Sequence, residues 1–463
     1  MYPDSISSAD IVAAFTGKLP EGRVLAGNLA GIDYSHDEAY AVTPQAPVAV
    51  ILPRSTAEVS TAMKVAGELG CPVTPRGSGT GLAGGCIPAP GGVVMSMEKM
   101  SSILEVDTEN NVAVVQPGVT LSELDEMTSS YGLAYPVVIG EKGASLGGTV
   151  ATNAGGMQAV KYGVTRNHVL GLEVVLGSGE VIRTGGKVFK RSSGYDLTQL
   201  FTGSEGTLGI VTEAIVRLVP RMRYRSTLLV PFNDLTEAAG IVPLITSSGV
   251  APLVLEYIDA LSMDAITKDA GLELGVEDSV KARCSAYLVI VLEGNREALV
   301  DQDMEDISGM VAGSGALDVY VLPPTADTKL LEARDKAHWM AKANGADDIV
   351  DVVVPRSMMS KFMEAVSAIS EQFSSLVVGC GHAGDGNVHL SIFQPDERVR
   401  HDVVRALLRT GIGLGGDVSA EHGIGKAKRE DFLDLTGTVE IDLMRRIKSA
   451  LDPKGILSPG NVV

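Results

Sequence analysis

The sequence predicts an α+β protein of two or three domains, and three observations support this. A chain of 463 residues is longer than one ordinary hydrophobic core can serve, so we expect it to divide. Between residues 44 and 220, short β-like segments alternate with glycine-rich turns. After Pro220, strand candidates alternate with long helical stretches, which is typical of an antiparallel sheet covered by helices. We therefore predict domains at 1–220 and 221–410 and a C-terminal segment at 411–463.

The elements of the first region follow from periodicity and capping residues. A helix is expected over 56–69, because its apolar residues have helical spacing and Ser55 or Thr56 can cap it. Thr120 and Glu123 have capping-box spacing, which predicts a second helix over 120–131. The expected strands are 48–52, 71–74, 93–97, 103–107 and 112–116, with a loop at 77–92. In the second region we expect strands at 226–230 and 286–293 and helices at 235–247 and 297–312.

Composition narrows the class of protein. An apolar content of 45% and a charged content of 21% are those of a packed globular protein. The net charge of −19 argues against nucleic acid or an anionic membrane as a partner. The four cysteines stand alone and form no CxxC pair, which argues against an iron–sulfur cluster or a zinc ribbon. With no signal peptide and no apolar run of membrane-spanning length, we expect a soluble cytoplasmic protein.

A glycine-rich loop at 75–85 contains a formal GxGxxG pattern. A Rossmann fold requires a helix directly after that pattern, and here Pro88 and Pro90 follow, so NAD binding of that kind is disfavoured. The loop can still bind a pyrophosphate through its amides, with Arg76 adding positive charge, or it can be a hairpin without a ligand. Further glycine-rich loops at 140–156 and 203–212 favour a long ligand such as a flavin dinucleotide.

Two polar clusters near the C-terminus contain the residue types most suited to chemistry. The first, at 381–389, places His382 and His389 in a glycine-rich turn between apolar runs. The second, at 419–425, contains Glu421 and His422. Two imidazoles and a carboxylate can bind a divalent metal, and His422 can act as acid or base. The alternatives are a tight turn with incidental histidines, or Asp385 as a ligand instead of a turn cap.

Together these segments resemble the FAD-linked oxidases of the vanillyl-alcohol oxidase/p-cresol methylhydroxylase superfamily. Within it they are most similar to the D-2-hydroxy-acid dehydrogenases, a branch with D-lactate and D-2-hydroxyglutarate dehydrogenases and the glycolate oxidase D subunit. The resemblance extends from about residue 44 to the C-terminus and rests on segments 75–85, 147–156, 161–163, 193–197, 203–212, 381–389 and 421–425. It implies a p-cresol-methylhydroxylase-type FAD-binding domain of two α/β subdomains. A ferredoxin-like antiparallel-sheet substrate domain and a C-terminal helical segment closing the site would follow.

The resemblance also implies roles for individual residues. FAD would be held by Arg76, Gly77, Ser78, Gly79, Thr80, Gly81, Gly143, Ser145, Gly148, Asn153, Glu205, Gly209 and Ile210. Many members of the superfamily attach FAD to a histidine where this chain has Thr80, so we expect non-covalent FAD. His382, His389 and Glu421 would bind a divalent metal, zinc by expectation, while His422 takes the substrate's hydroxyl proton. Arg334 matches an arginine that binds the substrate carboxylate.

The substrate implied is a D-2-hydroxy acid, oxidised to the 2-oxo acid. Relatives that use 2-hydroxyglutarate carry a lysine and an asparagine where this chain has Ile349 and Ser391, which favours a D-lactate-like monocarboxylate or a larger apolar acid. D-2-hydroxyglutarate or glycolate is the alternative. Less favoured are flavin-dependent group exchange, as in alkylglycerone-phosphate synthases, a flavin-free metallohydrolase and a non-enzymatic subunit. A separate electron acceptor (a quinone, a cytochrome, an electron-transfer flavoprotein or an iron–sulfur subunit) and a homodimer are expected.

Overall fold

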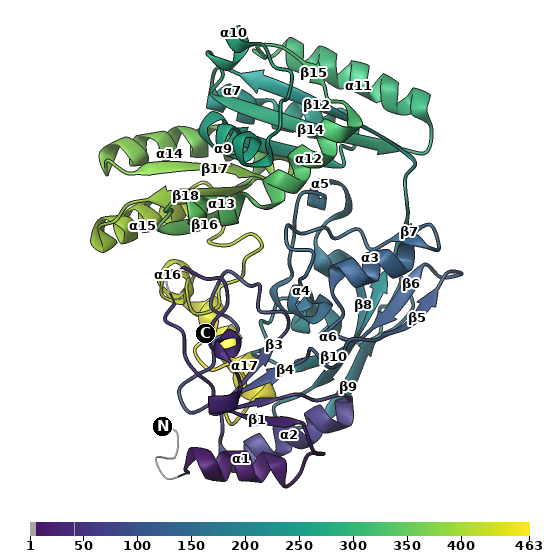
Figure 1. Ribbon diagram of the computed structural model, residues 1–463, viewed down its shortest axis with the longest axis vertical. Helices are drawn as coiled ribbons and strands as arrows, with labels where there is room; N and C mark the ends of the chain where they lie inside the picture. The colour runs from purple at the N-terminus through teal and green to yellow at the C-terminus, as the bar shows by residue number, and fades with distance from the viewer. Residues whose placement is uncertain (1–5, 41) are drawn as a thin grey trace.

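The computed structural model describes residues 6–40 and 42–463 and has the expected α+β architecture (Figure 1). Figure 1 shows the first domain in purple to blue and the second in teal to light green, with the yellow C-terminal segment against the first domain. Among the described residues, no helix is long and apolar enough to cross a membrane. All four cysteines are free.

The first domain contains two sheets. The mixed four-stranded sheet has the order β1 (Val24–Ala26), β2 (Ala49–Ile51), β4 (Val93–Ser96) and β3 (Val73–Arg76). The antiparallel five-stranded sheet has the order β5 (Ile103–Asp107), β6 (Val112–Val115), β10 (Ile210–Arg217), β8 (Val169–Val175) and β9 (Val181–Gly185). A short ribbon pairs β11 (Val219–Pro220) with β7 (Leu133–Ala134). The helices are α1 (Ser8–Thr16), α2 (Thr56–Leu69), α3 (Leu121–Ser129), α4 (Leu146–Thr152), α5 (Ala159–Tyr162) and α6 (Leu197–Phe201), with 3-10 turns at Gly27–Leu29, Ile32–Ser35 and Thr165–Asn167.

The second domain is built on one antiparallel sheet of seven strands, which confirms the predicted sheet type. Their order is β15 (Tyr320–Val321), β12 (Tyr224–Phe232), β14 (Ala286–Gly294), β13 (Val254–Asp259), β17 (Leu376–Gly381), β18 (Asn387–Phe393) and β16 (Asp348–Val353). The helices are α7 (Leu235–Gly240), α8 (Val242–Ser247), α9 (Ala260–Ala270), α10 (Asp278–Lys281), α11 (Glu297–Ala312), α12 (Pro324–Asp335), α13 (Ala337–Ala343), α14 (Met359–Gln372) and α15 (Glu397–Gly413). Two 3-10 turns lie at Arg356–Met358 and Ala383–Asp385.

Local signals in the sequence predicted several elements well. Ser55 caps α2, and Thr120 and Glu123 form the expected capping box of α3. Residues 77–92 contain no helix, as their two prolines predicted. The single helix expected over 235–247 is wrong: the structure divides it into α7 and α8 at Ile241. Pro243 causes the break, because it lacks an amide proton and is tolerated only in the first turn of a helix.

The C-terminal segment joins the two domains. It contains α16 (Arg429–Leu435) and α17 (Thr438–Leu451). Leu457 forms a parallel bridge with Val73 of β3 and is buried in the core of the four-stranded sheet. Phe432 instead packs into the core of the second domain. The chain therefore returns to the first domain after α15. On the basis of this arrangement we propose domain boundaries near residues 221 and 410, where the sequence predicted them.

Candidate functional site

A cavity of about 970 Å³ lies between the two domains. This is the upper end of the size range of ligand sites in proteins, so the cavity has room for a large cofactor and a small substrate. All three glycine-rich loops of the first domain line it, together with strands β17 and β18 of the second. Eleven of the residues expected to hold the cofactor line this cavity: Arg76, Gly77, Ser78, Gly79, Thr80, Gly81, Ser145, Gly148, Glu205, Gly209 and Ile210.

The two other predicted cofactor residues lie behind the cavity wall and shape the loops. The carbonyl of Gly143 accepts a hydrogen bond from Ser78 Oγ at 2.7 Å. Asn153 ends α4 with a positive φ of 53° and accepts the amide of Arg166 at 2.9 Å. Neither residue is among those that line the cavity. In this structure they fix loop geometry, and the sequence could not separate that role from ligand contact.

Two glycines allow the first loop to approach its neighbours closely. A Cβ on Gly77 would lie 2.0 Å from Ser145 Oγ, so any side chain there would push the first two loops apart. Gly79 has a φ of 78°, and a Cβ there would overlap the guanidinium of Arg76. Arg76 is buried and donates from Nη1 to the carbonyl of His36 at 2.7 Å. The loops therefore present backbone to the cavity, which suits an extended ligand with a pyrophosphate.

The second domain contributes a compact group of ligand-type side chains. His382 follows β17, His389 lies within β18, and Glu421 comes from the loop after α15. One atom of each lies within 4.8 Å of the others. Glu421 Oε1 is 3.3 Å from His382 Nε2 and 3.2 Å from His389 Nε2. Two imidazoles and one carboxylate are the donor set of His2Glu zinc sites that keep a position open, so these residues fit a divalent metal.

A buried carboxylate orients His382 from behind. Glu256 on β13 contacts His382 Nδ1 at 2.6 Å, which leaves Nε2 facing Glu421. Burial opposes a charge on His382, but Glu256 and Glu421 outweigh it and raise the pKa of His382 to about 10. Without a metal this imidazole is therefore protonated at neutral pH. Glu256 also pairs with Nε of Arg334 at 2.5 Å.

Asp351 anchors the loop that carries Glu421 and His422. It is completely buried on β16. Its Oδ2 accepts the amides of Ala420, Glu421 and His422 at 3.1, 3.1 and 2.9 Å. Burial would raise the pKa of Asp351, yet its interactions with His422 and Lys428 hold that pKa well below its usual range. Although Asp351 could join a metal group with the two nearest histidines, these donors already occupy its oxygen, and we assign it as an anchor.

Asp351 was missed as a site residue in the sequence analysis. One signal was present: an acid within the apolar run 349–354 is expected to be buried, and a buried acid needs partners. What the sequence could not show is the pairing of β16 with β18, which puts Asp351 directly opposite His389.

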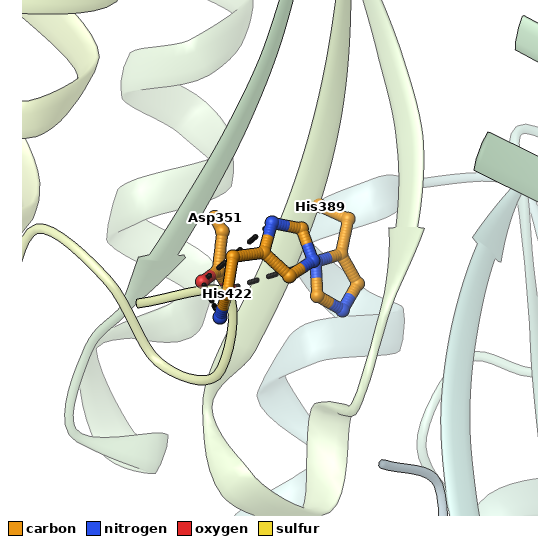
Figure 2. Close-up of side chains that lie close together, drawn as sticks. All are labelled: Asp351, His389 and His422. Carbon is orange, nitrogen blue, oxygen red and sulfur yellow. Dashed lines mark hydrogen bonds and ion pairs between the residues drawn. The ribbon is translucent and has the colours of Figure 1, made fainter. Parts of the chain in front are cut away.

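His422 lies beside Asp351 and His389 (Figure 2). Its ring stacks on that of His389, with centroids 5.0 Å apart and an interplanar angle of 13°. Nδ1 is 3.8 Å from Asp351 Oδ2, and Nε2 is 3.9 Å from Glu421 Oε1. Burial lowers the pKa of His422 to about 3, although Asp351 opposes that shift. The imidazole is therefore neutral at physiological pH, the state that a general base requires.

Glu205 connects this loop to the first domain. It has a φ of 52° in the third glycine-rich loop, and its carboxylate accepts the amides of Ile424 and Gly425 at 2.8 and 2.7 Å. Burial raises the pKa of Glu205. The carboxylate expected to contact the cofactor thus also binds the loop that presents Glu421 and His422. Asp385, the alternative metal ligand considered from the sequence, lies 3.9 Å from Arg356. It does not belong to the group formed by His382, His389 and Glu421, called the metal-type group from here on.

Comparison with known proteins agrees with this geometry. Residues 221–462 match the family described as FAD linked oxidases, C-terminal domain, and residues 47–185 match the FAD binding domain. The chain belongs to the FAD-linked oxidases. It is 48% identical to an uncharacterized FAD-linked oxidoreductase of Mycobacterium tuberculosis, over 98% of this chain and 99% of that protein. This FAD-linked oxidase is thus an oxidoreductase with an FAD-binding domain, as the resemblance implied.

Relatives with assigned names place it in one branch of the family. It is 40% identical to glycolate oxidase subunit GlcD of Bacillus subtilis, over 94% of this chain and 93% of that one. It is 38% identical to a D-lactate dehydrogenase of Archaeoglobus fulgidus, over 89% and 91%. The FAD-linked oxidase therefore belongs to the D-lactate, glycolate and 2-hydroxyglutarate dehydrogenase branch.

Solved structures confirm the fold. A substrate-bound p-cresol methylhydroxylase aligns with a TM-score of 0.80 at 19% identity, over 100% of this chain and 98% of that one. An alkyldihydroxyacetonephosphate synthase aligns with a TM-score of 0.75 at 19% identity, over 99% and 86%. At such identities the likeness concerns the fold alone.

Proposed function

We propose that this FAD-linked oxidase oxidises a D-2-hydroxy acid, with a D-lactate-like monocarboxylate favoured, to the 2-oxo acid. The proposal rests on one observation. The possible metal ligands His382, His389 and Glu421, the neutral buried His422 and the buried Arg334 all line one cavity. The three glycine-rich loops of the first domain line the same cavity. The names of two relatives, a glycolate oxidase subunit and a D-lactate dehydrogenase, refer to 2-hydroxy acids, which supports the same reaction class. A flavin-free metallohydrolase does not fit a chain that belongs to the FAD-linked oxidases.

Each residue of the site has its own role in the proposed reaction. When bound, FAD would accept the C2 hydrogen of the substrate as a hydride. A divalent metal, zinc by expectation, held by His382, His389 and Glu421 would make the substrate's hydroxyl more acidic. His422 takes the hydroxyl proton at Nε2, because its Nδ1 faces Asp351. Arg334 binds the substrate carboxylate through Nη2, which is buried and has no hydrogen-bond partner in the described structure.

The wall of the cavity favours a monocarboxylate. Ile349 and Ser391 line it beside His389 and offer no positive charge to a second carboxylate. D-2-hydroxyglutarate and glycolate remain the alternatives. A separate electron acceptor, a cytoplasmic location and a homodimer stay predictions.

The proposed function is tested by anaerobic reduction of the flavin. The purified, metal-replete protein is mixed in turn with D-lactate, L-lactate, glycolate and D-2-hydroxyglutarate. We expect D-lactate to bleach the oxidised-flavin absorption and EDTA treatment to slow this. A yellow protein that no hydroxy acid reduces would contradict the proposal and shift weight to flavin-dependent group exchange.

We predict that FAD is bound without a covalent link. Thr80 lines the cavity in the first loop, at the position where many relatives attach the flavin to a histidine, and threonine cannot form that bond. Acid or denaturant should therefore release all flavin from the polypeptide. Filtration after denaturation measures this, and yellow colour retained with the protein would contradict it.

Metal binding at pH 7 is predicted to release about one proton. The pKa of His382 is raised to about 10, so its proton must leave before Nε2 can bind an ion. Glu421 contributes none, because although burial opposes it, His382 and His389 hold its pKa well below the usual range. Titration calorimetry of the metal-free protein with Zn²⁺ should give binding enthalpies that differ between buffers of different ionisation enthalpy. Equal enthalpies would show that His382 is already deprotonated.

A further inference from the structure

His338 on α13 lines the cavity but has no role in the proposed chemistry. Both of its ring nitrogens are shielded from solvent, and neither has a hydrogen-bond partner in the described part of the chain. Buried polar atoms are almost always paired, and leaving them unpaired destabilises the fold. Two unpaired nitrogens on one cavity-lining ring therefore indicate that a ligand supplies the partner.

The surroundings of His338 are aromatic. The centroid of its ring lies 5.2 Å from that of Tyr40 and 5.4 Å from that of Trp339, and both pairs pack edge to face. The nearby ammonium of Lys342 lies over the Tyr40 ring and is paired with Glu38 at 3.3 Å. Burial lowers the pKa of His338 to about 4, so the ring is neutral and offers one donor and one acceptor.

Strand β18 forms a further part of the cavity wall. His389, Ser391 and Phe393 alternate along the strand, so they share one face, and all three line the cavity. Ser391 is flanked by Ile349 on β16 and Val378 on β17, which are its register partners and also line the cavity. Beyond the metal-type group the cavity thus continues past small and apolar side chains. These side chains line the same cavity as His338, and this part of the cavity is called the side-chain compartment.

We propose that this compartment receives an aryl side chain of the substrate and that His338 hydrogen-bonds a phenolic hydroxyl on it. The inference rests on the proposed function and narrows its substrate class from D-2-hydroxy acids in general to 3-(4-hydroxyaryl) derivatives. A neutral imidazole between aromatic rings suits a phenol, which both donates and accepts. A second carboxylate at this place would need a cation, and the ammonium beside the ring, that of Lys342, is already paired with Glu38.

The test compares two ligands that differ by one hydroxyl, D-phenyllactate and D-3-(4-hydroxyphenyl)lactate, with D-lactate as the reference. The holoenzyme is mixed anaerobically with each, and the rate constant of flavin reduction is measured against ligand concentration. The variant His338→Phe keeps the ring and removes both nitrogens. His401→Phe, at an exposed histidine of α15, is the matched control.

We expect the native protein and His401→Phe to oxidise the hydroxylated acid with a kcat/KM about tenfold higher than that for D-phenyllactate. A preference of this size corresponds to the gain of one hydrogen bond. His338→Phe should abolish this preference and leave the rate with D-lactate unchanged. His338→Gln, which keeps a donor and an acceptor, should retain part of it. Equal rates with both aryl acids in the native protein, or an unchanged preference in His338→Phe, would overturn the inference while D-lactate still reduces the flavin. Failure of every D-acid to reduce the flavin would instead overturn the proposed function.

Discussion

Replacement of His422 by alanine is expected to slow flavin reduction by about 10²–10⁴-fold, the usual contribution of a general base. His422 lies within 4 Å of both Glu421 and Asp351, and burial lowers its pKa to about 3, so its imidazole is neutral at physiological pH. Its removal leaves the three metal-type ligands and the loop amides bound to Asp351 in place. The measurement is stopped-flow absorbance of the oxidised flavin under anaerobic conditions with saturating D-lactate.

The controls separate chemistry from folding. His401→Ala, at the exposed histidine of α15, should reduce its flavin at the native rate. The His422→Ala protein should bind FAD and one metal ion per chain as the native protein does. Native-like reduction by His422→Ala would assign the base to another group. Loss of the bound metal in that variant would show that His422 is a ligand.

Asp351→Asn is expected to lower the free energy of unfolding by about 3–5 kcal/mol, the cost of breaking a buried charge network. Asparagine can accept fewer of the hydrogen bonds that Oδ2 now receives from residues 420–422 and Ser419. It also leaves the ammonium of Lys428, 3.5 Å away, without its counter-charge. Because the same loop carries Glu421, the variant should lose metal as well. Urea unfolding of the metal-free protein and metal analysis of the holoenzyme measure the two effects.

The pH dependence of this effect has a definite sign. The folded-state pKa of Asp351 lies below the value of about 3.9 expected for the unfolded chain. Its stabilisation is therefore fully present above pH 4 and is lost as pH falls through the folded-state pKa. The difference in stability between native and Asp351→Asn protein should shrink only below pH 4. Asp442→Asn, at an exposed ion pair on α17, should change stability by less than about 1 kcal/mol. An equal effect of both substitutions would contradict the role of Asp351.

The parts of this protein that sequence could predict are those whose chemistry is local in the chain. The caps at Ser55 and Thr120, the helix-free loop at 77–92 and the turn at 381–389 each lie within one short stretch of the chain. The spacing of residues within that stretch is therefore enough to predict them. Asp351 and Glu256 were not predicted, because their roles depend on strand register. Asp351 becomes important only where β16 places it opposite His389, and Glu256 only where β13 lies beside β17.

The hydrogen bonds from Ile424 and Gly425 to Glu205 have a consequence for recombination within the family. The loop that presents Glu421 and His422 is held at its start by Asp351 of the second domain and at its end by Glu205 of the first. A chimaera that takes its domains from two relatives keeps this geometry only when both anchors match the transplanted loop. Natural or engineered crossovers should therefore succeed where residues 203–212, 351 and 419–425 come from one parent, and fail where they are divided.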